Sequence, residues 1–194
     1  EKKLNIKFCK KNLIITYHAD TIDNTRCLKN LSTVLYSLKK IKNTKMIITS
    51  PNADARGVIM INYIRKYIRK NKLENFLFFK SLGSQTYLSL LKIVDGVVGN
   101  SSSGISEAPF FGIGTVNIGD RQQGRLMVSS IVNCSISKIS IVKSINKILN
   151  NNFKKNIKNE IKRYYGDGQT AKKIVKKLLL FNFKKYKKKV FYDI

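Results

Sequence analysis

The chain has 194 residues, and its 38 Lys and Arg against 11 Asp and Glu give a formal net charge of +27. Hydrophobic residues make up 43% of the sequence, which is enough for a buried core and excludes general disorder. No apolar run approaches the ~20 residues of a membrane-spanning helix, and the opening EKKLNIKFCKKN lacks the apolar segment of a secretory signal.

Strand and helix patterns alternate along the first 120 residues. Short β-branched or aromatic runs predict strands at 13–17, 46–49, 76–79, 96–98 and 114–118. Apolar residues spaced by three and four predict helices over 20–42, 58–68, 87–93 and 103–111. Continuous apolar strands joined by helices predict an α/β fold, namely a Rossmann-like, doubly wound parallel sheet covered on both faces.

Beyond residue 125 the pattern weakens. A Ser-rich link is expected there, followed by a helix over 137–150 and a Lys-rich helix. The segment YGDG (165–168) then precedes a last amphipathic helix through Ile174 and Leu178.

The segment Gly99–Glu107 is the candidate phosphate site. In such sheets ligands bind beyond the carboxyl ends of the strands, and this segment joins the end of a strand to the start of a helix. Backbone N–H groups and the positive end of the helix dipole favour a phosphate there. The hydroxyls of Ser101, Ser102 and Ser103 add donors, and Gly104 permits close approach of the backbone.

Other candidates follow neighbouring strands. His18 ends the first strand on the same rim, where it is either a structural residue or a partner for phosphate. Arg121 follows the fifth strand and suits an anionic ligand. Glu107 either completes a capping box at the helix start or accepts hydrogen bonds from ribose hydroxyls. No carboxylate pair and no Ser/His/Asp or Cys/His arrangement is evident.

The net charge and the cysteine pattern limit the classes of partner that the chain is expected to bind. Only seven of the 38 basic residues are Arg, and the Lys residues are scattered, which argues against a nucleic-acid reader. The densest basic stretch, 184–189, resembles a solvated tail. Cys9, Cys27 and Cys134 form no metal or disulfide pattern. We expect no cofactor, metal, nucleic-acid or membrane partner. We do expect a general attraction to anions and a location in the reducing cytoplasm.

The run VGNSSSGISEAPFFGIGTVNIGDRQQGR (98–125) closely resembles the C-terminal-domain signature of the UDP-N-acetylglucosamine 2-epimerases, especially their hydrolysing branch. ITYHADT, SPNADARG and YGDG support the resemblance, which covers about residues 12–180. It implies the C-terminal half of a glycosyltransferase-B-like pair of Rossmann domains that hold a nucleotide sugar between them. The implied reaction converts UDP-N-acetylglucosamine and water to N-acetylmannosamine and UDP, for sialic-acid-like sugars.

The resemblance also implies residue roles. It implies that His18 contacts the diphosphate and lies in the active site, and that Ser101 and Ser102 bind the diphosphate. It also implies that Glu107 binds the ribose hydroxyls and that Arg121 lies at the rim near the nucleotide. With Ser103 and Gly104 from the same loop, these form the expected UDP site, and His18 is the expected catalytic residue. The chain departs from the family pattern at Ala19, where a Pro usually follows the His.

The largest departure from the family pattern is that this sequence does not include the first Rossmann domain of the family. That domain carries the carboxylates that act at carbon 2 of the sugar. We read 1–11 as a linker remnant, 12–180 as the nucleotide-binding domain and 181–194 as a basic tail. The start at Glu1 suggests a missing upstream segment, and the chain alone is expected to be inactive. The full-length protein is expected to form a homo-oligomer.

Three alternatives stay open at this point. One is an epimerase for a GDP-linked or further modified sugar. Another is a basic module that binds nucleic acid or an anionic membrane without catalysis. The third is a non-catalytic remnant that merely folds.

Overall fold

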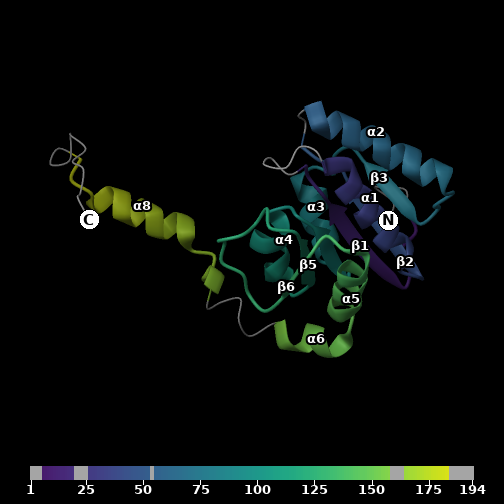
Figure 1. Cartoon of the computed structure of the whole chain (residues 1–194). Coiled ribbons are helices and arrows are strands. Elements are labelled where there is room, and N and C mark those ends of the chain that lie inside the picture. Colours follow the sequence, from purple (N-terminus) through teal and green to yellow (C-terminus); the bar gives the residue numbers. More distant parts are fainter. Residues whose placement is uncertain (1–5, 20–25, 53–54, 158–163, 184–194) are drawn as a thin grey trace.

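A computed structural model describes residues 6–19, 26–52, 55–157 and 164–183 of the chain. Six strands form one sheet in the order β3-β2-β1-β4-β5-β6, and every strand pair is parallel (Figure 1). The strands are β1 (Lys11–Thr16), β2 (Thr44–Thr49), β3 (Phe76–Phe79), β4 (Gly96–Gly99), β5 (Gly114–Ile118) and β6 (Ile131–Cys134). The predicted Rossmann-like sheet is confirmed.

Helices cover both faces of this sheet because neighbouring strand residues point to opposite faces. Leu13 and Ile15 of β1 pack into one core, and Ile14 packs into the other. The first core is closed by α1 (Cys27–Lys39), α2 (Ala55–Lys70) and α5 (Lys138–Ile148), and the second by α3 (Ser84–Leu91) and the 3₁₀-helix η2 (Ala108–Phe111).

The strand order creates a switch point between β1 and β4. The chain leaves β1 for α1 on one face, whereas it leaves β4 for α4 (Ser103–Ser106) and η2 on the other. The carboxyl ends of these two strands therefore border the crevice in which such folds bind ligands. At this place Gly99 has φ +146°, and a Cβ there would lie 1.9 Å from the carbonyl oxygen of Thr16. Only glycine permits this approach of β4 to β1.

Two predicted helices differ from the observed ones. The helix expected over 20–42 is α1, which begins at Cys27; residues 20–25 lie outside the described ranges. The helix expected over 103–111 is divided at Glu107 into α4 and η2. Pro109 lacks an N–H and disfavours the α conformation of the preceding residue, which explains the change to 3₁₀ geometry.

The C-terminal third contains a strand that the sequence did not predict. The expected Ser-rich link includes β6, which pairs with β5 at the edge of the sheet. The predicted helix over 137–150 is confirmed as α5, and the Lys-rich helix begins as α6 (Asn151–Asn156), with 158–163 outside the described residues. The last predicted helix is α8 (Thr170–Leu180), which extends away from both helical layers (Figure 1).

Within the described ranges, no helix combines the length and apolar character needed to cross a bilayer.

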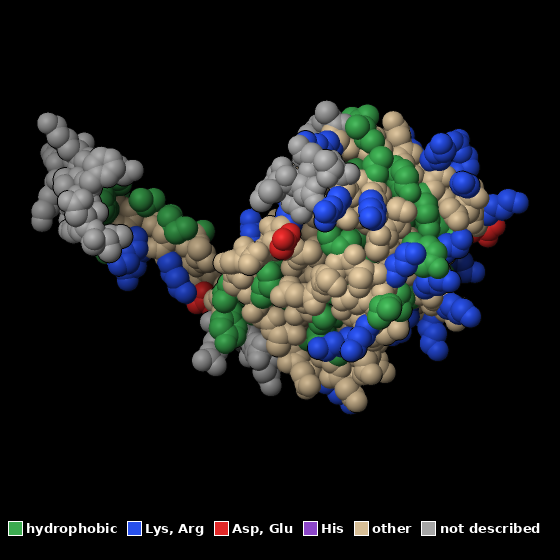
Figure 2. Space-filling model, viewed as in Figure 1, with side chains coloured by type: hydrophobic (Ala, Val, Ile, Leu, Met, Phe, Trp, Pro, Cys, Tyr) green, Lys and Arg blue, Asp and Glu red, His purple; other side chains and the backbone are tan. Residues whose placement is uncertain are grey.

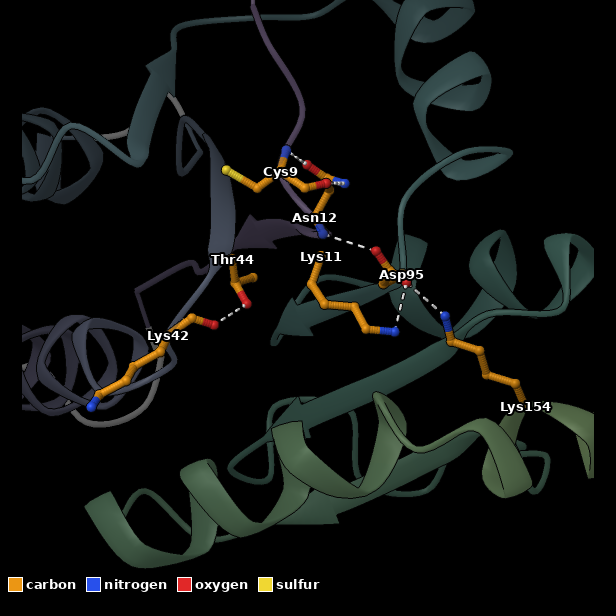
Figure 3. Close-up of polar contacts among 7 residues, drawn as sticks. All are labelled: Cys9, Lys11, Asn12, Lys42, Thr44, Asp95 and Lys154. Carbon is orange, nitrogen blue, oxygen red and sulfur yellow. Dashed lines mark hydrogen bonds and ion pairs between the residues drawn. The ribbon is translucent and has the colours of Figure 1, made fainter.

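An ion-pair cluster joins the amino-terminal edge of the sheet to α6 (Figure 3). The Asp95 carboxylate accepts hydrogen bonds from Lys154 Nζ at 2.8 Å and from the backbone N–H of Asn12 at 2.9 Å, and Lys11 Nζ lies 3.5 Å away. Burial raises the pKa of Asp95, but the hydrogen bonds from Lys154 and Asn12 and the charges of Lys154 and Lys11 together outweigh burial, so the pKa lies below its ordinary value.

Asp95→Asn is therefore expected to lower the free energy of unfolding at pH 7 by about 1–3 kcal/mol, since it removes charge-assisted hydrogen bonds. A carboxyl whose folded pKa is lowered stabilises the protein above its unfolded value of about 3.9, and this contribution is lost as pH falls through the folded pKa. The free energies of unfolding of the two proteins, measured by urea titration from pH 7 to pH 3, should therefore draw closer as the pH falls. Asp167→Asn, at an exposed ion pair, is the control. A constant difference at every pH would contradict the assignment.

Candidate functional site

Asn100 joins the ends of β1 and β4. Its side-chain Oδ1 accepts the backbone N–H of His18 at 2.7 Å, and its Nδ2 donates to the His18 carbonyl at 3.0 Å. Its own backbone N–H donates to Thr16. Asn100 is only 2% exposed, so these bonds are shielded from water. The amide therefore fixes the backbone of His18 beside the serine loop.

The backbone carbonyl of Asn100 holds the loop that follows β5. It accepts Arg121 Nη1 at 3.2 Å and Gln122 Nε2 at 2.8 Å. Gln122 is as buried as Asn100, whereas Arg121 is partly exposed. Three loops that are far apart in sequence thus meet at one residue, and the positive charge of Arg121 is brought to the edge that carries His18 and the serines.

His18 is held in one orientation. Its Nδ1 accepts the backbone N–H of Asn52 at 3.1 Å, so the neutral imidazole carries its hydrogen on Nε2. The side chain is 9% exposed. A neutral ring in this tautomer is a donor through Nε2, and a phosphate oxygen is a suitable acceptor.

The serine loop presents both hydroxyl and backbone donors. Ser101, Ser102 and Ser103 are each partly exposed. Within the described part of the chain, the backbone N–H groups of Ser101 and Ser102 have no acceptor. The carbonyl of Ser102 instead accepts from Ile105 and Ser106 and so begins α4. Successive backbone N–H groups without acceptors can bind an anion where they converge on it.

The expected helix dipole contributes little, because α4 has only four residues. The close approach that Gly104 permits is to the sheet and not to a ligand, since a Cβ at this position would lie 2.8 Å from Thr115 Cγ2. The Thr115 hydroxyl donates to the Gly104 carbonyl at 2.7 Å, which fixes α4 on β5. Gly104 thus positions the serine loop against the sheet.

Glu107 does not form the capping box. The N-cap of α4 is Ser102, it has no side-chain capping bond, and Glu107 lies at the C-terminal end of the helix. Its side chain is partly exposed. The prediction of a capping box for Glu107 is therefore wrong, and the binding of ribose hydroxyls by Glu107 stays a prediction.

Tyr87 of α3 reaches the serine loop from the second face of the sheet. Its hydroxyl lies 2.8 Å from Ser103 Oγ. Burial raises the pKa of Tyr87, the hydrogen bond to Ser103 lowers it by a smaller amount, and the charge of Glu107 adds to the rise. The phenol therefore keeps its proton at neutral pH.

Several contacts at this edge were missed by sequence reasoning. Asn100, Gln122 and Tyr87 were not assigned, although Asn100 and Gln122 lie inside the quoted motif. Tyr165 of YGDG donates its hydroxyl to the Ile105 carbonyl at 2.7 Å, which ties the segment before α8 to α4. Among the described residues, no group of three His, Cys, Asp or Glu is arranged to hold a metal ion.

An open cavity of about 680 Å³ adjoins the loop of Arg121. It is lined by the ends of β5 and β6 and the start of α1, through Arg26, Asn30, Gly119, Asp120, Asn133, Cys134, Ser135 and Ile136. The cavity lies at the same edge of the sheet as the candidate residues, but neither His18, nor the serine loop, nor Arg121 is among its described lining residues.

Asn100→Ala is expected to destabilise the protein by about 1–3 kcal/mol, because it leaves the buried N–H and carbonyl of His18 without their partner. Chemical denaturation measures this loss, and Asn151→Ala, at an exposed position at the start of α6, is the control. Equal stability of the two variants would contradict the role given to Asn100.

Comparison with known proteins gives the family. The model of the UDP-N-acetylglucosamine 2-epimerase family matches residues 1–179. The chain is 41% identical over 156 residues to the hydrolysing GDP/UDP-N,N'-diacetylbacillosamine 2-epimerase of Campylobacter jejuni, covering 80% of this chain and 40% of that protein. It is 28% identical to the polysialic acid biosynthesis protein P7 of Escherichia coli, over 100% of this chain and 50% of that protein. It thus spans about half the length of these relatives.

Solved structures give the same fold. The UDP-GlcNAc 2-epimerase of Methanocaldococcus jannaschii, in complex with UDP-GlcNAc and UDP, matches with a TM-score of 0.69 and 18% identity over 88% of this chain and 45% of that one. The C-terminal domain of a group 1 glycosyl transferase from Francisella tularensis matches with a TM-score of 0.58 and 14% identity, over 84% of this chain and 90% of that domain. The chain therefore belongs to the UDP-N-acetylglucosamine 2-epimerase family and corresponds to its C-terminal half.

Proposed function

We propose that this chain is the nucleotide-binding half of a hydrolysing nucleotide-sugar 2-epimerase, with UDP-N-acetylglucosamine as substrate. The observation that carries the proposal is the set of contacts around Asn100, which holds His18 and Arg121 beside the serine loop at the switch point of the sheet. The hydrolysing relative from C. jejuni supports the reaction class.

The proposed contacts follow from the donors at this edge. The diphosphate receives hydrogen bonds from the backbone N–H groups and hydroxyls of Ser101 and Ser102, and Arg121 offsets its charge. His18 donates from Nε2 to an oxygen of the leaving UDP. The carboxylate of Glu107 accepts from the ribose hydroxyls. Ser103 and Gly104 complete the loop.

The reaction implied by the family begins with elimination of UDP to give a glycal, and water then adds with inversion at carbon 2 to release N-acetylmannosamine. Negative charge grows on UDP as the bond to the sugar breaks. Fixed donors aimed at that charge stabilise the transition state, and this is the contribution proposed for His18, Arg121 and the serine loop. The product would serve synthesis of sialic-acid-like sugars, as the name of the E. coli relative suggests.

A second domain is proposed to supply the carboxylates that act at carbon 2. The chain covers only 40% of the C. jejuni relative and 50% of the E. coli relative, which leaves room for such a domain. The apolar face of α8 supports the same proposal: no residue of α8 is buried, and Figure 2 shows apolar side chains along it, away from the main body. The large exposed ones are Ile174, Val175, Leu178, Leu179 and Leu180. Apolar faces of this kind mark interfaces.

The complete enzyme is further proposed to be a homo-oligomer in the cytoplasm. Cys9, Cys27 and Cys134 form no disulfide bond with one another, which is typical of proteins of reducing compartments.

A second substrate class is a nucleotide-linked N,N'-diacetylbacillosamine. The C. jejuni relative is named for such a sugar carried on GDP or UDP, and it is 41% identical to this chain. Both classes share the diphosphate, so the contacts around Asn100 serve either.

Calorimetric titration of the 194-residue chain with UDP tests the nucleotide site. We expect weak binding that Ser102→Ala weakens by about 1–3 kcal/mol, the value of a hydrogen bond to a charged group. Parallel titrations with GDP and with both sugar nucleotides distinguish the substrate classes. Ser89→Ala, at an exposed hydroxyl of α3, is the matched control. Binding to nucleic acid or to an anionic membrane that weakens steeply with salt, and that neither UDP nor Ser102→Ala changes, would instead favour a basic anion-binding module.

The isolated chain is expected to release no N-acetylmannosamine from UDP-N-acetylglucosamine, because the proposed carboxylates are supplied by the other domain. A coupled assay for free UDP and for the sugar measures this. Turnover by the chain alone would refute the proposed division between the two domains.

A further inference from the structure

A chain of hydroxyl groups runs from α3 into the serine loop. Tyr87 Oη lies 2.8 Å from Ser103 Oγ, and Ser103 Oγ donates to Ser101 Oγ at 3.2 Å. The backbone N–H of Ser103 also points to Ser101 Oγ, at 3.4 Å. Tyr87 is separated from Ser103 by 16 residues, so this contact exists only in the folded domain.

The direction of each hydrogen bond follows from the number of hydrogens. A hydroxyl group has one hydrogen to donate. Because Ser103 donates its hydrogen to Ser101, Tyr87 is the donor in the bond between Tyr87 and Ser103. The raised pKa of the phenol agrees with a protonated donor at neutral pH.

The hydroxyl of Ser101 is the last of the three hydroxyls, and it donates its hydrogen to neither of the other two. Ser101 Oγ accepts from Ser103, and no acceptor for the Ser101 hydroxyl hydrogen lies among the described residues. Ser101 also has an unpaired backbone N–H within the same part of the chain. Two donors on one residue, both without acceptors, suit a ligand group that carries acceptors only, and a phosphate is such a group.

We propose that Tyr87 is a positioning residue for the diphosphate site: its hydroxyl orients Ser103, and Ser103 orients Ser101 as a donor to a phosphate oxygen. This rests on the proposed function. Tyr87 contacts no phosphate itself, and the hydroxyl of Ser103 acts through Ser101. Phe at position 87 would fill the same space but would leave Ser103 free to rotate and donate elsewhere.

Calorimetric titration of the 194-residue chain with UDP and with inorganic pyrophosphate tests the proposal. Tyr87→Phe should raise the Kd for both ligands about three- to tenfold, the range for one neutral hydrogen bond. Ser103→Ala should give a similar loss. The double variant should bind no more weakly than the weaker single variant, because both changes break the same relay. Tyr36→Phe, a half-exposed tyrosine of α1, is the matched control and should match the wild type.

The outcomes separate this proposal from the one on which it rests. Wild-type protein that binds neither ligand contradicts the nucleotide site itself and the relay with it. Binding by the wild type with an unchanged Kd for Tyr87→Phe contradicts the relay alone. Losses for Tyr87→Phe and Ser103→Ala that multiply in the double variant also contradict it, since independent structural defects would combine in that way. Far-UV circular dichroism identifies a variant that fails to fold, and the other single variant then carries the test.

Discussion

The hydrogen bonds of Asn100 determine how three loops meet at the carboxyl edge of the sheet. Its side chain pairs with the backbone of His18, and its carbonyl accepts from Arg121 and Gln122. Parallel strands leave their following loops independent of one another, so a buried residue must fix the relative positions of those loops. Gly99 makes this possible, because only a residue without Cβ lets β4 approach Thr16 so closely. Two adjacent residues thus define the geometry of the site.

In this geometry the serine loop would bind an anion through single donor groups and not through a helix dipole. A four-residue helix has a small dipole, so the donors at its start must act as individual N–H and O–H groups. Their strength then depends on orientation, which the Asn100 contacts and the close packing of Gly104 on Thr115 supply. The formal charge of +27 attracts any anion to the surface. The proposed preference for a phosphate would come from the oriented donors.

The sequence predicted the strands whose residues are continuously apolar and the edge of the sheet on which the candidates lie. It could not predict β6, because an edge strand with half-buried Ile131 and Val132 and exposed Asn133 shows no continuous apolar run. The break at Glu107 could have been inferred from Pro109. The contacts of Asn100 with His18 and of Tyr87 with Ser103 could not, since they join residues 82 and 16 positions apart and leave no local pattern.

The position of α8 bears on how binding and turnover are divided. An isolated helix of 11 residues gains little from its own hydrogen bonds, and α8 buries none of its side chains. Its stability therefore depends on a surface that covers its apolar face, which the proposed second domain would provide. The proposed diphosphate donors lie in the loop that follows β4 and do not involve α8. Loss of the second domain would thus expose α8 and remove the proposed carboxylates while leaving the Asn100 contacts intact, so binding can persist where turnover cannot.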